Sequence, residues 1–107
     1  MPEKNDPWYA LLGLAKRAGK VVAGEETVLK AIRGHKAGVV IMSSDASDRT
    51  KKTVNNKCIF YKVPIFETSE RVTLGRAIGQ PPRVLIAVTD SRFAARLIEW
   101  LGPSTRG

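Results

Sequence analysis

The chain is poor in the residues that build disulfide frameworks and metal centres, because its 107 residues include one cysteine, Cys58, and one histidine, His35. A single cysteine excludes an intramolecular disulfide and a cysteine-rich zinc module. A single histidine gives no support to a Ser/His/Asp triad or a multi-histidine zinc site. We therefore expect a fold held by packing in a reducing compartment, with His35 in a solvated loop and Cys58 in the core.

Long apolar runs and nucleotide-binding motifs are also missing. Uninterrupted apolar stretches such as 39–42 and 84–88 are far shorter than the roughly 20 residues that a membrane-spanning helix needs. The opening segment 1–7 is polar, and the residues that follow it do not have the pattern of a signal peptide. Neither a G-x-G-x-x-G fingerprint nor a Walker-type Gly-Lys-Ser/Thr sequence is present. These absences predict a cytoplasmic protein without a membrane segment or a nucleotide cofactor.

Positive charge is what the chain has in excess. Its 18 Lys and Arg residues outnumber its 10 Asp and Glu residues, which gives a formal charge of +8 and a pI near 10.1. Such an excess favours a polyanionic partner. Because 43% of the residues are hydrophobic, the chain can bury one core. We expect a single domain over 1–107, with its core at about 8–101 between a polar N-terminal segment and a short C-terminal tail.

Apolar spacing predicts an alternation of helices and strands. Strands are expected at 21–23, 39–42, 63–66 and 84–88. Helices are expected at 7–18, between Gly24 and Gly34, from Ser47 or Asp48 through a buried Tyr61, from a cap at Thr68 or Ser69 to Gly79, and from a cap at Thr89 to Gly102-Pro103. Two strands are too apolar to have a solvated face. This predicts an α/β fold, a three-layer α/β/α sandwich with helices on both faces of the sheet.

Carboxylates follow the ends of two expected strands. Asp45 and Asp48 come after 39–42, and Asp90 comes after 84–88. Carboxylates at such strand ends can hold a magnesium ion, an arrangement that nucleases use. The same residues also suit turns and first helical turns, where acids accept backbone N–H groups. We prefer the second interpretation, so no metal or cofactor is expected, and a small metal-dependent nuclease stays as an alternative function.

Basic residues cluster at the boundaries of the expected helices. The clusters are Lys16, Arg17 and Lys20; Lys30, Arg33 and Lys36; and Arg49, Lys51 and Lys52. Pairing with helix dipoles explains part of them, but not the excess of the whole domain. The turn at Gly24, the turn 43–45 and the proline-stiffened loop 80–83 can gather on one edge as a recognition surface. Since neither a helix-turn-helix nor a zinc finger is visible, RNA is the favoured partner, with a protein-interaction module of non-specific RNA affinity as a further alternative.

A series of short segments occurs in a characteristic order. The segments are Gly24–Lys30, Ala31–Ala37, Val39–Ile41, Asp45–Ser47, Val63–Ile65, Leu74–Gly79 and Val84–Val88. In this order, over about 8–101, they resemble the kink-turn-binding ribosomal proteins of the L7Ae and L30e type. The Leu11–Ala15 and Ala87–Asp90 segments are most similar to the short bacterial YlxQ-like branch of that family.

The resemblance implies a mixed four-stranded sheet between helices, in a non-enzymatic, ribosome-associated protein that binds sharply bent RNA with tandem sheared G·A pairs. We expect it to act as a monomer. In the family, the glycine turn and the start of the second helix enter the widened groove, and a later loop faces a flipped-out nucleotide. At the polar pair of that helix the family usually carries asparagine or lysine followed by glutamate or glutamine, where this chain has Glu26 and Thr27. The RNA contacts expected from motif position and charge are Gly24, Glu26, Thr27, Lys30, Arg33, Lys36, Gln80, Pro81, Pro82 and Arg83.

Overall fold

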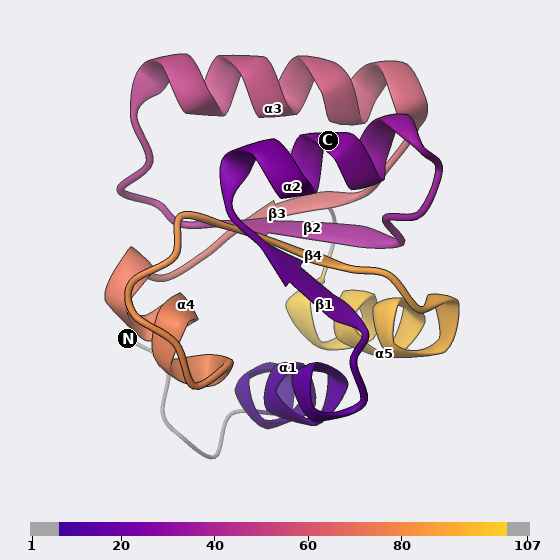
Figure 1. Cartoon of the computed structure of the whole chain (residues 1–107), viewed down its shortest axis with the longest axis vertical. Coiled ribbons are helices and arrows are strands. Elements are labelled where there is room, and N and C mark those ends of the chain that lie inside the picture. The colour runs from indigo at the N-terminus through magenta and orange to yellow at the C-terminus, as the bar shows by residue number, and fades with distance from the viewer. Residues whose placement is uncertain (1–6, 103–107) are drawn as a thin grey trace.

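Helices and strands alternate along the chain in a computed structural model that describes residues 7–102 (Figure 1). The helices are α1 (Pro7–Arg17), α2 (Glu25–Arg33), α3 (Asp48–Tyr61), α4 (Arg71–Ala77) and α5 (Ser91–Leu101). The strands are β1 (Val21–Ala23), β2 (Val39–Met42), β3 (Ile65–Glu67) and β4 (Leu85–Val88). Within 7–102, none of the helices combines the length and apolar character needed to cross a lipid bilayer. The predicted order of elements is confirmed.

The four strands form one mixed sheet in the order β1-β4-β2-β3. Strand β4 lies antiparallel to both β1 and β2, whereas β2 and β3 are parallel. Ala87 in β4 is paired with Val22 on one side and with Val40 on the other. Every residue of β2 and β4 is buried, as expected for central strands that are covered on both faces.

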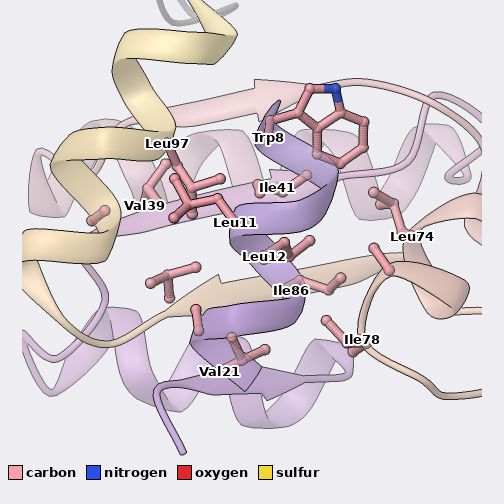
Figure 2. Packing of buried hydrophobic residues seen from close by; sticks show 14 of the residues in the cluster. Trp8, Leu11, Leu12, Val21, Val39, Ile41, Leu74, Ile78, Ile86 and Leu97 are labelled. Carbon is pink, nitrogen blue, oxygen red and sulfur yellow. The ribbon is translucent and has the colours of Figure 1, made fainter. Parts of the chain in front are cut away.

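Side chains of the central strands alternate between two hydrophobic clusters, one on each face of the sheet. On one face, Val39 and Ile41 of β2 contact a cluster that includes Leu12 of α1 and Leu97 of α5 (Figure 2). On the other face, Val40 and Met42 belong to the cluster under α2 and α3. Figure 1 shows α2 and α3 over one face, with α1, α4 and α5 over the opposite face. The three-layer α/β/α sandwich is therefore confirmed.

Several predicted boundaries are wrong where local backbone geometry decides them. Helix α4 begins after Glu70, and not at a cap by Thr68 or Ser69. Ser69 has a φ of +59°, and its carbonyl accepts hydrogen bonds from the backbone N–H of Ser44 (2.7 Å) and from the Ser44 hydroxyl (2.8 Å). Ser69 therefore belongs to a turn that is fastened to the end of β2, and the helix starts only beyond it.

Helix α3 begins at Asp48 after the Ser47 cap and ends at Tyr61, as predicted, whereas the start of β3 differs from the prediction. Lys62 adopts a left-handed conformation at the end of α3, and the N–H of Val63 donates to the carbonyl of Cys58 over 2.9 Å. This helix-terminating bond takes Val63 away from the strand, so β3 begins at Ile65. Tyr61, expected on the buried face, is only half buried. Cys58 lies in the core as predicted.

Helix α5 is capped by Asp90, and not by Thr89 as predicted. The Asp90 carboxylate accepts the backbone N–H groups of Arg92 (2.8 Å) and Phe93 (3.0 Å). The N–H of Thr89 instead donates to the carbonyl of Lys20 over 2.8 Å, which continues the pairing of β4 with the segment before β1. Thr89 therefore belongs to the strand pairing, and the next residue, Asp90, caps the helix.

Gly75 in α4 fixes the position of the loop 80–83. The carbonyl of Gly75 accepts the N–H of Gln80 over 2.8 Å. A Cβ atom added at Gly75 would lie 2.7 Å from the Pro81 carbonyl carbon and 2.8 Å from the Gln80 carbonyl oxygen. Both neighbours are backbone atoms, so the loop can approach the helix this closely only because residue 75 has no side chain.

We predict that Gly75→Ala lowers the free energy of unfolding by about 1–3 kcal/mol, because the added methyl must displace the loop backbone. Urea unfolding measures this change. Arg76→Ala, at the adjacent exposed position of α4, is the control and should stay within about 0.5 kcal/mol of the unsubstituted protein. Equal stability of the two variants would contradict the close packing of loop and helix.

The stability of the fold depends on pH through Asp90. The backbone N–H of Phe93 lowers the pKa of Asp90, aided by the N–H of Arg92 and by the charges of Arg92 and Lys20. A carboxyl whose folded pKa lies below its unfolded value of about 3.9 stabilises the fold above that pH, and this contribution is lost as the pH falls through the folded pKa. Asp90→Asn keeps a capping side chain but removes the charge. We expect Asp90→Asn to unfold at a lower temperature at pH 7, with the difference shrinking below about pH 4; a difference independent of pH would contradict the assignment.

Candidate nucleic-acid interface

The turn at Gly24, the turn 43–45 and the loop 80–83 meet at one edge of the sheet. Because β4 runs antiparallel to both β1 and β2, it begins where both of those strands end. The N–H of Gly24 donates to the carbonyl of Leu85 (3.0 Å), and the N–H of Ser43 donates to the carbonyl of Val84 (2.8 Å). The prediction that these three segments gather on one edge is confirmed.

A hollow of about 340 Å³ opens at this edge, and we call it the loop hollow. It lies at the starts of α2 and α3, which Figure 1 shows at the same end of their layer. Its lining residues are Gly24, Glu25, Ser47, Thr50, Arg71, Pro82, Arg83, Val84 and Leu85. The residues that line the loop hollow therefore include hydroxyl, guanidinium and carboxylate side chains.

Gly24 gives α2 an open start. Its φ of +99° is accessible to glycine at little cost, and no side chain caps the helix. The first N–H groups of a helix have no partner within the helix and carry partial positive charge. In the same turn, Glu25 and Glu26 are both exposed. Glu25 in addition accepts a hydrogen bond from the Thr50 hydroxyl over 3.0 Å, which ties α2 to α3.

A second hollow, of about 270 Å³, runs beside α2, and we call it the lysine hollow. Thr27 and Lys30, one turn apart, contribute to it from the helix, and Lys36 contributes from beyond the helix end. Its lining residues are Val22, Thr27, Lys30, Ala31, Gly34, Lys36 and Thr89. Arg33 is exposed in the last turn of α2 and lines neither hollow. Three of the residues singled out from the sequence are therefore brought together here, and Arg33 is not.

The loop 80–83 has two prolines, whose φ angles are fixed by their rings, and it presents two kinds of group. Pro81 and Pro82 are exposed. Arg83 is half buried, and its Nε donates to the Gln80 side-chain oxygen over 3.0 Å, while its backbone N–H donates to the Arg71 carbonyl over 3.0 Å. Gln80 therefore positions Arg83 at the rim of the loop hollow.

The three carboxylates considered as magnesium ligands are not brought together, because Asp90 lies at the other end of the sheet from Asp45 and Asp48. Asp45 and Asp90 follow the ends of β2 and β4, which run in opposite directions, so they lie at opposite ends of the sheet. Asp45 accepts the Arg71 guanidinium in an ion pair of 3.3 Å, and the Ser43 hydroxyl, together with Arg71, lowers the pKa of Asp45. Across the described residues, no group of three His, Cys, Asp or Glu side chains could hold a metal ion.

Three residues that line the loop hollow were not predicted from the sequence as RNA contacts: Ser47, Thr50 and Arg71. Arg71 joins the loop hollow through its bonds to Asp45, 26 residues away. No local pattern predicts such a contact. Ser47 was expected only as a cap, and its hydroxyl does accept the Thr50 N–H over 3.1 Å. Ser47, which was expected only to cap α3, therefore also lines the loop hollow.

His35 is exposed, as expected for a residue in a solvated turn. It adopts a φ of +58°, and its ring contacts that of Tyr61, with centroids 5.5 Å apart and edge to face. Sequence reasoning did not predict this contact between the end of α2 and the end of α3.

Comparison with known proteins agrees with this architecture. The sequence matches the Ribosomal protein L7Ae/L30e/S12e/Gadd45 family over residues 6–98. It is 51% identical over 94 residues to the RNA-binding protein YlxQ of Bacillus subtilis (strain 168), covering 88% of this chain and 94% of that protein. Its identity to the RNA-binding protein YlxQ of Enterococcus faecium is 42% over 89 residues, covering 83% and 85%.

A solved structure gives the same result in three dimensions. A protein of unknown function from Bacillus halodurans has a TM-score of 0.89 and 42% sequence identity, over 91% of this chain and 98% of the other. The resemblance inferred from the order of the sequence segments is therefore confirmed. The sequence match, the two curated relatives and the shared fold show that this chain belongs to the ribosomal protein L7Ae/L30e/S12e/Gadd45 family.

Proposed function

We propose that this protein binds RNA folded into a kink-turn, and that it does so in the cytoplasm, in association with the ribosome and without catalysing a reaction. The observation that carries the proposal is the meeting of the Gly24 turn and the loop 80–83 at one edge, beside the lysine hollow. The relatives from Bacillus subtilis and Enterococcus faecium are named as RNA-binding proteins. These names describe binding and no enzymatic reaction.

Phosphate attraction supplies the general part of the affinity. Lys30 and Lys36 line the same hollow, and Arg33 is exposed on the intervening turn. The open N–H groups at the start of α2 add partial positive charge where a phosphate can approach. Together with the net charge of +8, these groups favour release of counterions from RNA and make binding sensitive to salt.

Base recognition is assigned to the first turn of α2. A sharply bent RNA is read by its shape and by a few contacts to exposed base edges. Glu26 accepts hydrogen bonds from base amino groups, since its carboxylate is exposed and its neighbour Glu25 is engaged by Thr50. The hydroxyl of Thr27, one turn before Lys30, both donates and accepts. A lost carboxylate at position 26 would therefore change which bases are preferred.

The loop 80–83 completes the interface with two prolines on which RNA can pack. Its two exposed prolines have fixed φ values and lose little entropy when an RNA packs against them. They pack against a nucleotide that the bend turns outward. Arg83, held by Gln80, offers its remaining N–H groups to a nearby phosphate.

The proposal predicts a preference for the bent RNA. Affinity is measured for a kink-turn duplex and for the same duplex with its G·A pairs replaced by Watson–Crick pairs, each across a range of salt concentrations. We expect the kink-turn to bind at least about tenfold more tightly at every salt concentration, because only this shape fits the Gly24 turn and the loop together. Equal affinities that fall steeply with salt would overturn the proposal and leave non-specific attraction to phosphate, as in a protein-interaction module.

Lys30 gives the residue-level prediction. Lys30→Ala is expected to weaken kink-turn binding by about 1–3 kcal/mol if the ammonium contacts a base, or to lower the salt slope by about one if it contacts a phosphate. Lys52→Ala is the matched control, because Lys52 is an exposed lysine of α3 that lines neither hollow. Fluorescence anisotropy titrations measure both variants. Identical effects of the two substitutions would show that Lys30 contributes only to the net charge.

A further inference from the structure

Three aromatic side chains lie together where α2 and α3 end. Figure 1 shows these helix ends on the opposite side from the helix starts, which border the loop hollow. Tyr61 stands between the other two, with ring centroids 5.5 Å from His35 and 4.9 Å from Phe60. Both contacts are edge to face, an arrangement that aromatic pairs favour. Phe60 is 75% exposed, the largest exposure among the exposed large hydrophobic residues of the described chain. We call these three residues the aromatic cluster.

The fold does not explain the exposure of Phe60. The side chain belongs to neither hydrophobic core cluster, although Cys58, two residues earlier, is fully buried. An exposed phenylalanine beside a second ring offers a flat apolar surface that water solvates poorly. The aromatic cluster is therefore available for a ligand with a flat, apolar face.

The surroundings of the aromatic cluster are positively charged. The segments 33–38 and 55–63, which carry the three rings, contain four basic residues, Arg33, Lys36, Lys57 and Lys62, and no acidic residue. The two ion pairs recorded within residues 7–102 use other cations. Asp90, in the neighbouring loop, is engaged in capping α5. The charge around the rings thus suits a polyanion.

Two hollows connect the aromatic cluster to the proposed kink-turn interface. A hollow of about 540 Å³ is lined by His35, Lys36, Ala37, Gly38, Thr89 and Ser91. It shares Lys36 and Thr89 with the lysine hollow, which contains Lys30. The two hollows together form a surface path from Lys30 through Lys36 to His35. Ring contacts of His35 with Tyr61, and of Tyr61 with Phe60, continue this path to the rest of the aromatic cluster.

We propose that this path holds an unpaired stretch of RNA that leaves the bound kink-turn, with its phosphates along Lys30 and Lys36 and its bases stacked on Phe60 and Tyr61. The inference rests on the proposed function, because the bound kink-turn determines where the unpaired stretch of RNA begins. Stacking on exposed rings next to a basic groove is a general means of holding single-stranded nucleic acid, and it tolerates any base sequence. A second copy of this chain is an unsuitable occupant, because each copy carries a charge of +8.

The test compares a blunt kink-turn duplex with duplexes that carry a tail of about six unpaired nucleotides, attached to each strand end in turn, a length within the roughly 4–16 nucleotides of known single-strand sites. We expect one tail position to increase affinity at least about fivefold, the lower end of what one stacked base contributes. Phe60→Ala should abolish this gain and leave the affinity for the blunt duplex unchanged. The blunt-duplex affinity also reports that the variant is folded.

Matched variants separate stacking from other causes. Phe60→Trp keeps a ring and should retain the gain, while Phe60→Leu keeps apolar area without a ring and should lose it. Trp100→Ala removes another exposed aromatic side chain, on α5, and should change nothing. If the blunt duplex binds but no tail position raises affinity, or if Phe60→Ala keeps the gain, the inference is overturned while the proposed function stands. If the protein binds the blunt kink-turn duplex no more tightly than the Watson–Crick duplex, both this inference and the proposed function are overturned.

Discussion

Strands β2 and β4 contain no polar side chain, and all their residues are buried. Two such strands side by side must be covered on both faces, because exposure of either face to water would lose the free energy gained by burying it. The clusters under α1 and α5 on one side, and under α2 and α3 on the other, meet this requirement. The antiparallel pairing of these two strands then decides where the turns that flank them lie, since each end of the sheet has the end of one strand beside the start of the other.

This geometry explains why the candidate interface lies at one edge. The start of β4 places the loop 80–83 beside the end of β1 at Gly24 and beside the end of β2 at Ser43. The opposite end of the sheet collects Gly38, Thr89 and Asp90, with His35 and Lys36 close by. The two ends therefore have different chemistry: one has a turn, a helix start and a rigid proline loop, and the other has lysines and aromatic rings. Helix α2 connects the two.

Local patterns predicted the elements well, and they failed where a distant partner intervenes. The apolar spacing of α1 and α2 and the apolar runs of β2 and β4 suffice to place those elements within a residue or two. The cap of α4 was predicted wrongly because Ser69 is bound to Ser44, 25 residues earlier. The possible grouping of Asp45 with Asp90 failed because the directions of two neighbouring strands, which no local pattern contains, put them apart. The place of Arg71 in the loop hollow was not predicted, because it depends on bonds to Asp45, 26 residues away.

The sequence by itself determined the alternation of helices and strands, the need for helices on both faces of the sheet, the positive charge and the family, because each of these depends on residue type and on spacing along the chain. Only the tertiary structure decided which turns lie together and that Thr50 donates a hydrogen bond to Glu25. It also decided that residue 75 must lack a side chain beside the loop and that His35 contacts Tyr61. These features depend on strand order and direction and on the packing of residues far apart in the sequence. Hydrogen bonds and ring contacts of that kind are specified only when the whole core is assembled.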